Sequence, residues 1–358
     1  MELRLESQSS SSAFLEKDGQ RKKSPLSGRQ GLLLRVIITA CALAWVVGRI
    51  DGKALLDSLG RASPLAFAMA VLLTAMNLVV GSIRWRILLR AYGAPHLVPL
   101  SSLVRLNYVG FFYNTCLPGG VGGDLVRGYA SRRAFGEGGL ASAGAVVLVD
   151  RVLGLVGLLL VVAGTSMTFP LPFAEEHHVM LGASLGIVAG FAAIAGIGAG
   201  RSLAPWLPLP LWRIAERLPR IVIPGAFAWA VALSIVTQSV VALTGHLIAS
   251  SIAPIIRLRD SMVVVPIAMA TTFLPFLLSG TGAREEVFVR LYGPLGVSPS
   301  DALASSLLVW LSQVVVALIG GLLPAKEIQS RGESHQISLS KDLVEEPSSP
   351  ASAVKAHR

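Results

Sequence analysis

The sequence consists of apolar runs of about 20 residues, which are separated by short polar stretches rich in arginine. A run of this length is sufficient to cross the hydrocarbon core of a bilayer as a helix. Arginine clusters between such runs mark the cytoplasmic ends of the helices. We therefore expect six full transmembrane helices, over residues 32–47, 64–83, 140–163, 179–199, 222–250 and 301–323.

Two other apolar runs are unsuited to a simple crossing. The run over residues 98–116 contains Arg105, and both this run and the one over residues 261–278 end at a glycine-rich break. Each break is followed by a short charged segment that is too polar to span lipid alone. We expect two re-entrant helix pairs, of which the first enters from the cytoplasm and the second from outside. If either pair were a conventional crossing, the chain would have seven or eight spans.

The two glycine-rich breaks resemble each other. Residues 117–124 and residues 278–284 share the pattern Gly-x-Gly-(Gly/Ala)-charge, and they lie about 160 residues apart. Paired breaks at corresponding positions of two half-chains indicate a repeat with a binding site between its halves. Insertion from opposite faces is what an inverted repeat requires. The expected fold is an all-α polytopic membrane protein with about six full transmembrane helices, two re-entrant helix pairs and an inverted repeat.

Composition agrees with this fold class and narrows the function. Of 358 residues, 53% are hydrophobic and 15% charged, and the mean hydropathy of +0.65 is typical of a polytopic membrane protein. The net charge of +10 comes from basic residues at the ends of apolar runs, which argues against nucleic-acid binding. We expect disordered cytoplasmic tails over residues 1–30 and 325–358, flanking a transmembrane domain over residues 31–324 in the cell membrane.

The first break has the composition of a phosphate site. Gly119, Gly120, Gly122 and Gly123 permit positive φ and a close approach of the backbone to a ligand. We expect a helix that starts near Asp124, with this residue as its N-cap, so that free amides and the positive end of the helix dipole face the ligand. Under the alternative interpretation, the glycines only permit tight helix packing and the aspartate only caps.

Arginines near the first break are suited to bind an anion. Arg127 lies one turn along the expected helix, and Arg105 precedes the break. Either residue is expected to add charge-assisted hydrogen bonds to a lipid head group. Arg84 and Trp85, in contrast, follow the second apolar run and are expected at the cytoplasmic membrane interface, with the tryptophan as an anchor.

Asp150 and Arg151 lie near the middle of an expected transmembrane helix, where charged side chains are costly and are usually functional or paired. Adjacent helical residues point about 100° apart, so each needs a partner elsewhere. We expect Asp150 to pair with Arg127 or Arg284, and Arg151 to face a lipid phosphate or Asp124. A purely structural ion network that fixes the helix bundle is the alternative, and it is compatible with a binding role.

The second break mirrors the first with a change of charge. Gly280 and Gly282 precede Arg284 and Glu285, which stand where the first break has Asp124 and its neighbour. A salt bridge between the two breaks would form a gate that a substrate phosphate competes with. Interhelical hydrogen bonds are expected for the remaining polar residues of the apolar runs, Asn77, Asn107, Tyr108, Asn114 and Gln238.

Three motifs in a fixed order resemble a known family. Residues 114–124, which include Asn114 and Pro118, residues 149–154 and residues 279–285 are similar to the flippase-like transmembrane family. This family includes the membrane domain of lysylphosphatidylglycerol synthases, and the resemblance covers residues 32–323. It implies a polytopic fold with re-entrant segments that moves or presents polar lipids. The second break departs from the common pattern, because Ser279 and Thr281 stand where Asn and Ile often occur.

Two classes of function follow from these observations. The first is a lipid flippase or transporter that holds a phosphate-bearing, anionic or polar lipid between the two breaks. The second is a membrane enzyme, or the membrane subunit of a separately encoded lipid-modifying enzyme, in which Asp124 and Asp150 supply acid and base catalysis. About 30 residues follow the last span, too few for the soluble domain that transfers lysine in bifunctional relatives. Without an ATP-binding loop, a metal-ligand cluster or a nucleophile motif, we expect no cofactor, no metal and no catalytic residue.

Overall fold

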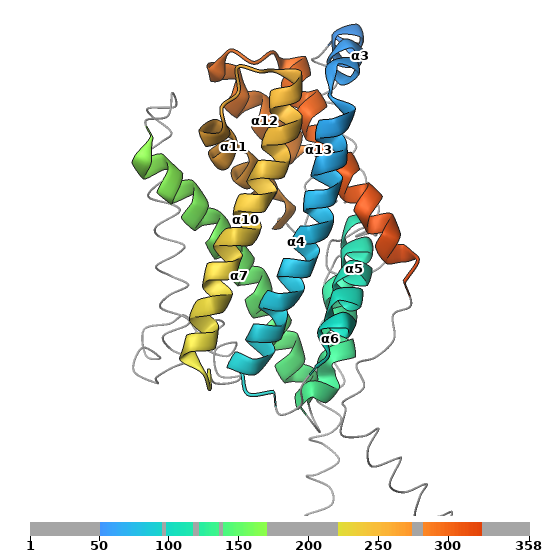
Figure 1. Cartoon of the computed structure of the whole chain (residues 1–358), viewed down its shortest axis with the longest axis vertical. Coiled ribbons are helices and arrows are strands. Elements are labelled where there is room, and N and C mark those ends of the chain that lie inside the picture. The colour runs from blue at the N-terminus through green and yellow to red at the C-terminus, as the bar shows by residue number, and fades with distance from the viewer. Residues whose placement is uncertain are drawn as a thin grey trace, which may run out of the picture.

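The computed structural model describes residues 51–94, 98–116, 122–135, 139–169, 221–273 and 282–323, and the described part of the chain contains helices and no strand (Figure 1). The all-α fold class is therefore confirmed for these residues. In chain order the elements are α3 (Gly52–Arg61), α4 (Pro64–Ala91), α5 (Leu100–Cys116), α6 (Gly122–Ser131), η3 (Arg132–Phe135), α7 (Gly139–Thr168), α10 (Pro224–Ile252), α11 (Leu258–Ala270), η5 (Thr271–Phe273), α12 (Ala283–Tyr292), η6 (Gly293–Leu295) and α13 (Pro299–Gly321).

Four helices, α4, α7, α10 and α13, are long and apolar enough to cross a membrane. They correspond to four of the six expected spans. The other two, over residues 32–47 and 179–199, lie outside the described residues. Two of the four helices begin with Ser-Pro: the hydroxyl of Ser63 accepts from the backbone N–H of Ala66, and that of Ser298 from Asp301. A serine N-cap followed by proline at the first helical position fixes these starts.

The remaining helices of the bundle come in two short pairs. The helices α5 and α6 pack on each other, as do α11 and α12, and none of the four is long enough to count as a membrane span. These pairs occupy the two runs for which the sequence predicts an interrupted crossing. The first part of each break, over residues 117–121 and 278–281, lies outside the described residues.

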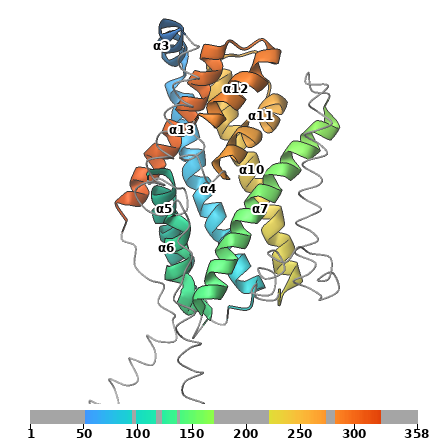
Figure 2. The ribbon, with the colours of Figure 1, turned by 180° about the vertical axis from the view of Figure 1, so that it is seen from behind.

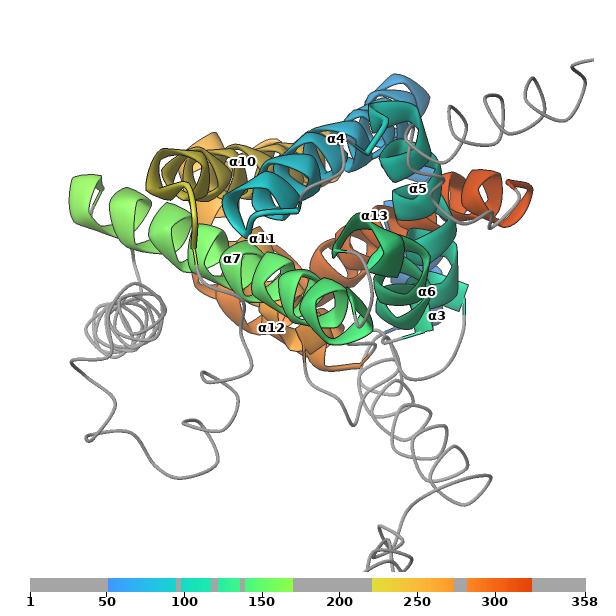
Figure 3. The same ribbon diagram turned by 90° about the horizontal axis from the view of Figure 1, so that it is seen from below.

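The two halves are arranged with opposite orientations. In Figures 1 and 2, α4 and α13 run downward from their N-terminal ends, whereas α7 and α10 run upward. The pair α5–α6 lies in the lower half of the molecule and the pair α11–α12 in the upper half. Figure 3 shows the same bundle from below, with α4 beside α10 and α7 on the opposite side. Corresponding elements thus run antiparallel, as expected for an inverted repeat.

Helix contacts repeat between the two halves. The contact of α5 with α13 has a counterpart in that of α11 with α7, and α6 packs on α7 as α12 packs on α13. Pro64 and Pro224 open the equivalent helices α4 and α10, while Gly139 and Pro299 open α7 and α13, with about 160 residues between the members of each pair. The repeat is therefore nearly in register along the chain, although the two copies share little sequence outside the breaks.

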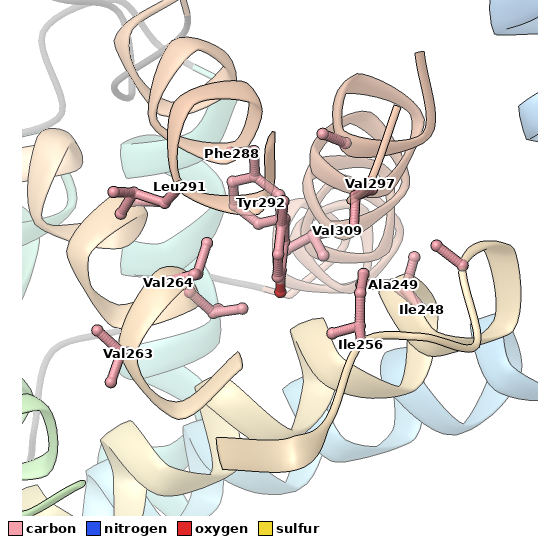
Figure 4. Packing of buried hydrophobic residues seen from close by; sticks show 14 of the residues in the cluster. Ile248, Ala249, Ile256, Val263, Val264, Phe288, Leu291, Tyr292, Val297 and Val309 are labelled. Carbon is pink, nitrogen blue, oxygen red and sulfur yellow. The ribbon is translucent and has the colours of Figure 1, made fainter. Parts of the chain in front are cut away.

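The core of the second half is a dense apolar cluster under α12. Phe288 and Tyr292 pack edge to face with ring centroids 5.5 Å apart, and both side chains are fully buried (Figure 4). Figure 4 shows residues of α10, α11 and α13 around them. Leu55 and Leu59 of the amphipathic helix α3 pack against this cluster. The apolar face of α3 is thus partly held by the protein.

Candidate functional site

Asp150 on α7 is the centre of a buried ion cluster. Its Oδ1 accepts a hydrogen bond from Nε of Arg84 on α4, and its Oδ2 accepts one from Nη2 of Arg127 on α6, both at 2.8 Å. Asp150 is 3% exposed and Arg127 is 7% exposed. Both carboxylate oxygens therefore have a charged donor, which is the condition under which a buried carboxylate is tolerated. Of the two partners that the sequence predicts for Asp150, Arg127 is thus confirmed, whereas Arg284 pairs elsewhere.

Asp124 continues this cluster into a chain of alternating charge. Its Oδ2 forms an ion pair with Nε of Arg151 on α7, and its Oδ1 lies 3.8 Å from Nη1 of Arg127. The order Arg84–Asp150–Arg127–Asp124–Arg151 begins and ends with an arginine, and we call these five residues the ion chain. It carries three positive and two negative formal charges. Arg151 is its most exposed member, with 29% of its side chain accessible.

Arg84 also connects the two halves. Its Nη1 donates to Ser234 Oγ at 3.2 Å and to Thr237 Oγ1 at 3.4 Å, both on α10. The expectation that Trp85 anchors the chain at the membrane interface is wrong, because Trp85 is fully buried, with Arg127 4.3 Å above its ring. The guanidinium of Arg84 turns inward because Asp150 on the neighbouring helix offers it a carboxylate.

The start of α6 is fixed by a side chain of α5. The backbone N–H of Gly123 donates to Oδ1 of Asn114 at 2.8 Å. Since α6 begins at Gly122, Asp124 lies in its first turn and is not its N-cap, contrary to expectation. The side chain of Asn114 provides the acceptor that the expected cap would have supplied.

Gly123 allows α5 and α6 to cross in close contact. A Cβ atom built at Gly123 would lie 1.9 Å from the backbone oxygen of Gly110 on α5. Positive φ is found in the described residues at Gly93, Gly282 and Gly296 and not at Gly123. The glycine is thus required here for space and not for backbone conformation. This crossing places Asp124 and Arg127 beside α7.

The ion chain lines a cavity of about 320 Å³ between the two halves. On the side of the second half, the wall contains Gln238, Thr272, Trp310 and Gln313, which are polar or aromatic but uncharged. Trp310 lies about 160 residues after Asp150, at the equivalent place in the repeat. The two walls of the cavity therefore come from equivalent elements of the repeat, but one wall is charged and the other is not. The described residues that line the cavity are Arg84, Asn107, Gly110, Phe111, Asn114, Thr115, Asp124, Arg127, Asp150, Arg151, Gly154, Leu158, Gln238, Val241, Met269, Thr272, Trp310 and Gln313.

Arg105 does not take part in this cavity. It lines a separate groove of about 600 Å³ between α4, α5 and α13. The lining of the cavity includes Asn107 and Asn114 of α5, whereas the lining of the groove includes Arg105 and Tyr108. Arg105 therefore belongs to a different face of α5 from the residues with which the sequence grouped it.

At the second break, a local ion pair takes the place of the expected salt bridge between the two breaks. Arg284 and Glu285, 1% and 0% exposed, form an ion pair with each other, and Arg284 Nε donates to Ser306 Oγ at 3.0 Å. Glu285 Oε2 accepts from the backbone N–H of Gly282, which has φ of 90°. Because Asp124 pairs with Arg151, the expected salt bridge between the breaks is not formed among the described residues. Neither Arg284 nor Glu285 lines the cavity.

The structure brings together five of the predicted binding residues at the cavity: Asn114, Asp124, Arg127, Asp150 and Arg151. Gly122 and Gly123 open α6 beside them, while Gly282, Arg284 and Glu285 lie apart at the start of α12. Pro118, Gly119, Gly120 and Gly280 lie outside the described residues. Sequence analysis did not identify Arg84 as a partner of Asp150. A signal was present, because a carboxylate in an apolar helix needs a cationic partner, and this makes every nearby arginine a candidate.

The expected interhelical hydrogen bonds are present at three positions of α5, namely Asn114, whose contact with Gly123 of α6 is given above, Asn107 and Tyr108. Asn107 Nδ2 donates to the carbonyl of Leu78 at 2.8 Å, and Tyr108 Oη donates to that of Ala75 at 2.7 Å. Both acceptors lie on α4. These bonds fix the orientation of α5 relative to α4, and thereby which of its faces is turned to the cavity and which to the groove.

Comparison with known proteins places the chain in a family. The family model described as the lysylphosphatidylglycerol synthase TM region matches residues 32–321. The match includes all four membrane-spanning helices, both short helix pairs and the entire ion chain. Among curated proteins, no sequence matches the chain.

Proposed function

Because this chain belongs to the family of lysylphosphatidylglycerol synthase transmembrane regions, a family related to the modification and flipping of membrane lipids, we propose that it is a lipid transporter. It binds the phosphate-bearing head group of a polar lipid in the cavity between its two halves. The lipid then passes from one leaflet to the other without chemical change. A multi-pass membrane protein with a charged interior is suited to this task, because a head group cannot cross the hydrocarbon core unaided.

The observation that carries this proposal is the excess positive charge of the ion chain. Within the ion chain, three arginines face two aspartates inside a helix bundle, so these five residues together carry one formal positive charge. An anion such as a phosphodiester would neutralise it. Arg151, at the more accessible end of the chain, is suited to donate to two phosphate oxygens at once, because its guanidinium is a planar fork.

The uncharged wall of the cavity suits the rest of a head group. The two glutamines, Gln238 and Gln313, supply amide donors and acceptors, and Trp310 supplies a flat apolar surface. A polar but neutral part of a lipid head group would lie against this wall while its phosphate lies against Arg151. The two halves would then hold different parts of the same ligand.

The short helix pairs are proposed to be re-entrant. Each would enter from one face of the membrane and return to it, the pair α5–α6 from the cytoplasm and the pair α11–α12 from outside. Their positions at opposite ends of the bundle support this proposal. With this topology the protein would lie in the cell membrane, and both chain ends would lie in the cytoplasm.

A labelling experiment tests this topology. Cysteines are introduced singly at Arg133 and at Pro294, two exposed positions near opposite ends of the bundle, in a chain whose Cys41 and Cys116 are replaced by serine. A membrane-impermeant maleimide applied to intact cells should label the cysteine at Pro294 only, and the other after permeabilisation. Labelling of both cysteines in intact cells would contradict opposite insertion. Ser131 would be unsuitable, because its side chain is buried.

The binding role of Arg151 can be tested directly. Arg151→Ala should reduce the binding of phosphatidylglycerol about ten-fold or more, since a desolvated hydrogen bond to a charged group is worth roughly 1.5–3 kcal/mol. Arg151→Lys should restore part of the binding, because it keeps the charge without the fork. Native mass spectrometry of the purified protein measures lipid occupancy, and a leaflet-specific assay in vesicles measures transport.

The same vesicle assay distinguishes transporter from enzyme. A transporter changes the leaflet distribution of a lipid whose mass is unchanged. If the vesicle lipid changes mass instead, the protein is an enzyme or the membrane subunit of one. If Arg151→Ala binds and moves lipid like the parent, the ion chain is structural and the transport proposal loses its site.

A further inference from the structure

Two faces of the helix α5 line two different spaces in the molecule. Asn107, Gly110, Phe111 and Asn114 face the central cavity. A second set, Ser101, Val104, Arg105 and Tyr108, faces the groove between α4, α5 and α13. In both sets the spacing is i, i+3, i+4 and i+7, which places each set on a single helix face. No residue lines both spaces, so α5 forms a wall between them.

The groove opens toward the lipid around the bundle. Val79 lies on α4 and Ile319 on α13, two helices that are long enough to span the membrane, and these side chains are 36% and 47% exposed. Leu100, Val104 and Leu323 complete its apolar walls. A membrane-facing groove with such walls is filled by hydrocarbon, because water would leave the apolar surface unsatisfied. Its volume of about 600 Å³ is within the range of ligand sites.

The polar side chains at the groove indicate which kind of lipid head group it binds. Tyr108 donates its hydroxyl to the carbonyl of Ala75 and is thus used within the protein. Ser101 and Arg105, one helical turn apart in the first two turns of α5, supply a hydroxyl and a guanidinium. Among the described residues that line the groove there is no carboxylate, in contrast to the central cavity. Basic side chains between transmembrane helices bind anionic lipid head groups.

The wall of the groove is fixed by close helix contacts. A Cβ at Gly320 of α13 would lie 2.0 Å from the backbone oxygen of Tyr108, and one at Gly321 would lie 2.8 Å from the ring of Phe112. These glycines let α13 cross α5 at short distance, and Ile319 and Leu323 lie beside the crossing. The groove is therefore formed by the fold itself and does not depend on a ligand to open it.

We propose that this groove is a second lipid site, which holds one acyl chain of an anionic phospholipid while the phosphate of that lipid binds Arg105 and Ser101. The site is separate from the central cavity and does not require that the cavity carry the transported head group. Its ligand stays at the outer surface of the bundle, at the contact of α5 with α13.

Photo-crosslinking tests this proposal on the full chain in lipid nanodiscs. The probe is phosphatidylglycerol with a diazirine in one acyl chain, and crosslinked peptides are mapped by mass spectrometry. Label is expected on Val104, Ile319 and Leu323, and an excess of unlabelled phosphatidylglycerol should compete, while phosphatidylcholine should not. Arg105→Gln should reduce this label about ten-fold, the loss expected for one charge-assisted hydrogen bond.

Matched variants separate the groove from other sites. Arg90→Gln removes an exposed arginine at the end of α4 and should leave the groove label unchanged. Val104→Trp fills the groove without changing charge and should abolish the label, so that the proposal stays testable if Arg105→Gln does not fold. Arg151→Ala should not affect it. Equal labelling by phosphatidylcholine, or a label unchanged by both groove variants, would show ordinary boundary lipid and overturn the proposal.

Discussion

Replacing Asp150 by alanine is expected to destabilise the protein by about 3–5 kcal/mol, the cost of removing one partner from a buried ion cluster. The carboxylate accepts from Arg84 and from Arg127, so its loss leaves two guanidinium groups facing each other in the interior. The free energy of unfolding, measured by denaturant titration in mixed micelles, reports the effect.

A control for this experiment is present on α12. Glu286→Ala removes the acidic partner of an exposed i,i+4 pair with Arg290 and should cost no more than about 0.5 kcal/mol. In the double variant Asp150→Ala, Arg127→Met, one of the unpaired charges is removed, and part of the stability should return. Equal losses for Asp150→Ala and Glu286→Ala would mean that Asp150 does not compensate the arginines.

Gly123→Ala is expected to prevent normal assembly of the first half. The added Cβ would lie 1.9 Å from the backbone oxygen of Gly110, a distance that only a shift of α6 away from α5 can relieve. Such a shift would carry Arg127 and Asp124 away from α7. We expect a loss of folded, monodisperse protein in size-exclusion chromatography, and of lipid binding in whatever folded protein remains.

Gly144→Ala is the matched control, because it makes the same chemical change in a helix. No atom outside its own helix lies within 4 Å of a Cβ built at Gly144 on α7. This substitution should be neutral or stabilising by up to about 1 kcal/mol, since alanine is the better helix former. If Gly123→Ala behaves like Gly144→Ala, then α5 and α6 do not cross as closely as described.

The sequence predicted the transmembrane helices well because long apolar runs have only one common interpretation. Each described helix that qualifies as a span lies where a span was expected. The ends were less predictable. Arg84 follows directly on an apolar run and therefore has the sequence context of an interfacial residue. Only the position of α7, which brings Asp150 to it, shows that this arginine turns into the bundle.

The sequence predicted many of the residues that form the candidate site, but only some of the contacts between them. A charged residue within a span must have a partner, which is why the sequence alone narrowed the partner of Asp150 to Arg127 or Arg284. The position of Arg105 was also accessible, since its spacing from Asn107 places the two on different helix faces. The pairing of Arg284 with Glu285 was not, because neighbours on a helix seldom pair, and here the loop at Gly282 and the side chain of Ser306 position both groups.

The distribution of the ion chain has a mechanical consequence. All five of its residues belong to the first half, on α4, α6 and α7, and Arg84 connects it to the hydroxyls of Ser234 and Thr237 in the second half. If one half rocks against the other, the two hydrogen bonds from the guanidinium of Arg84 break, while the ion pairs within the ion chain remain. The first half would then move with its ion chain intact, and the uncharged wall of the cavity in the second half would be the surface along which it tilts.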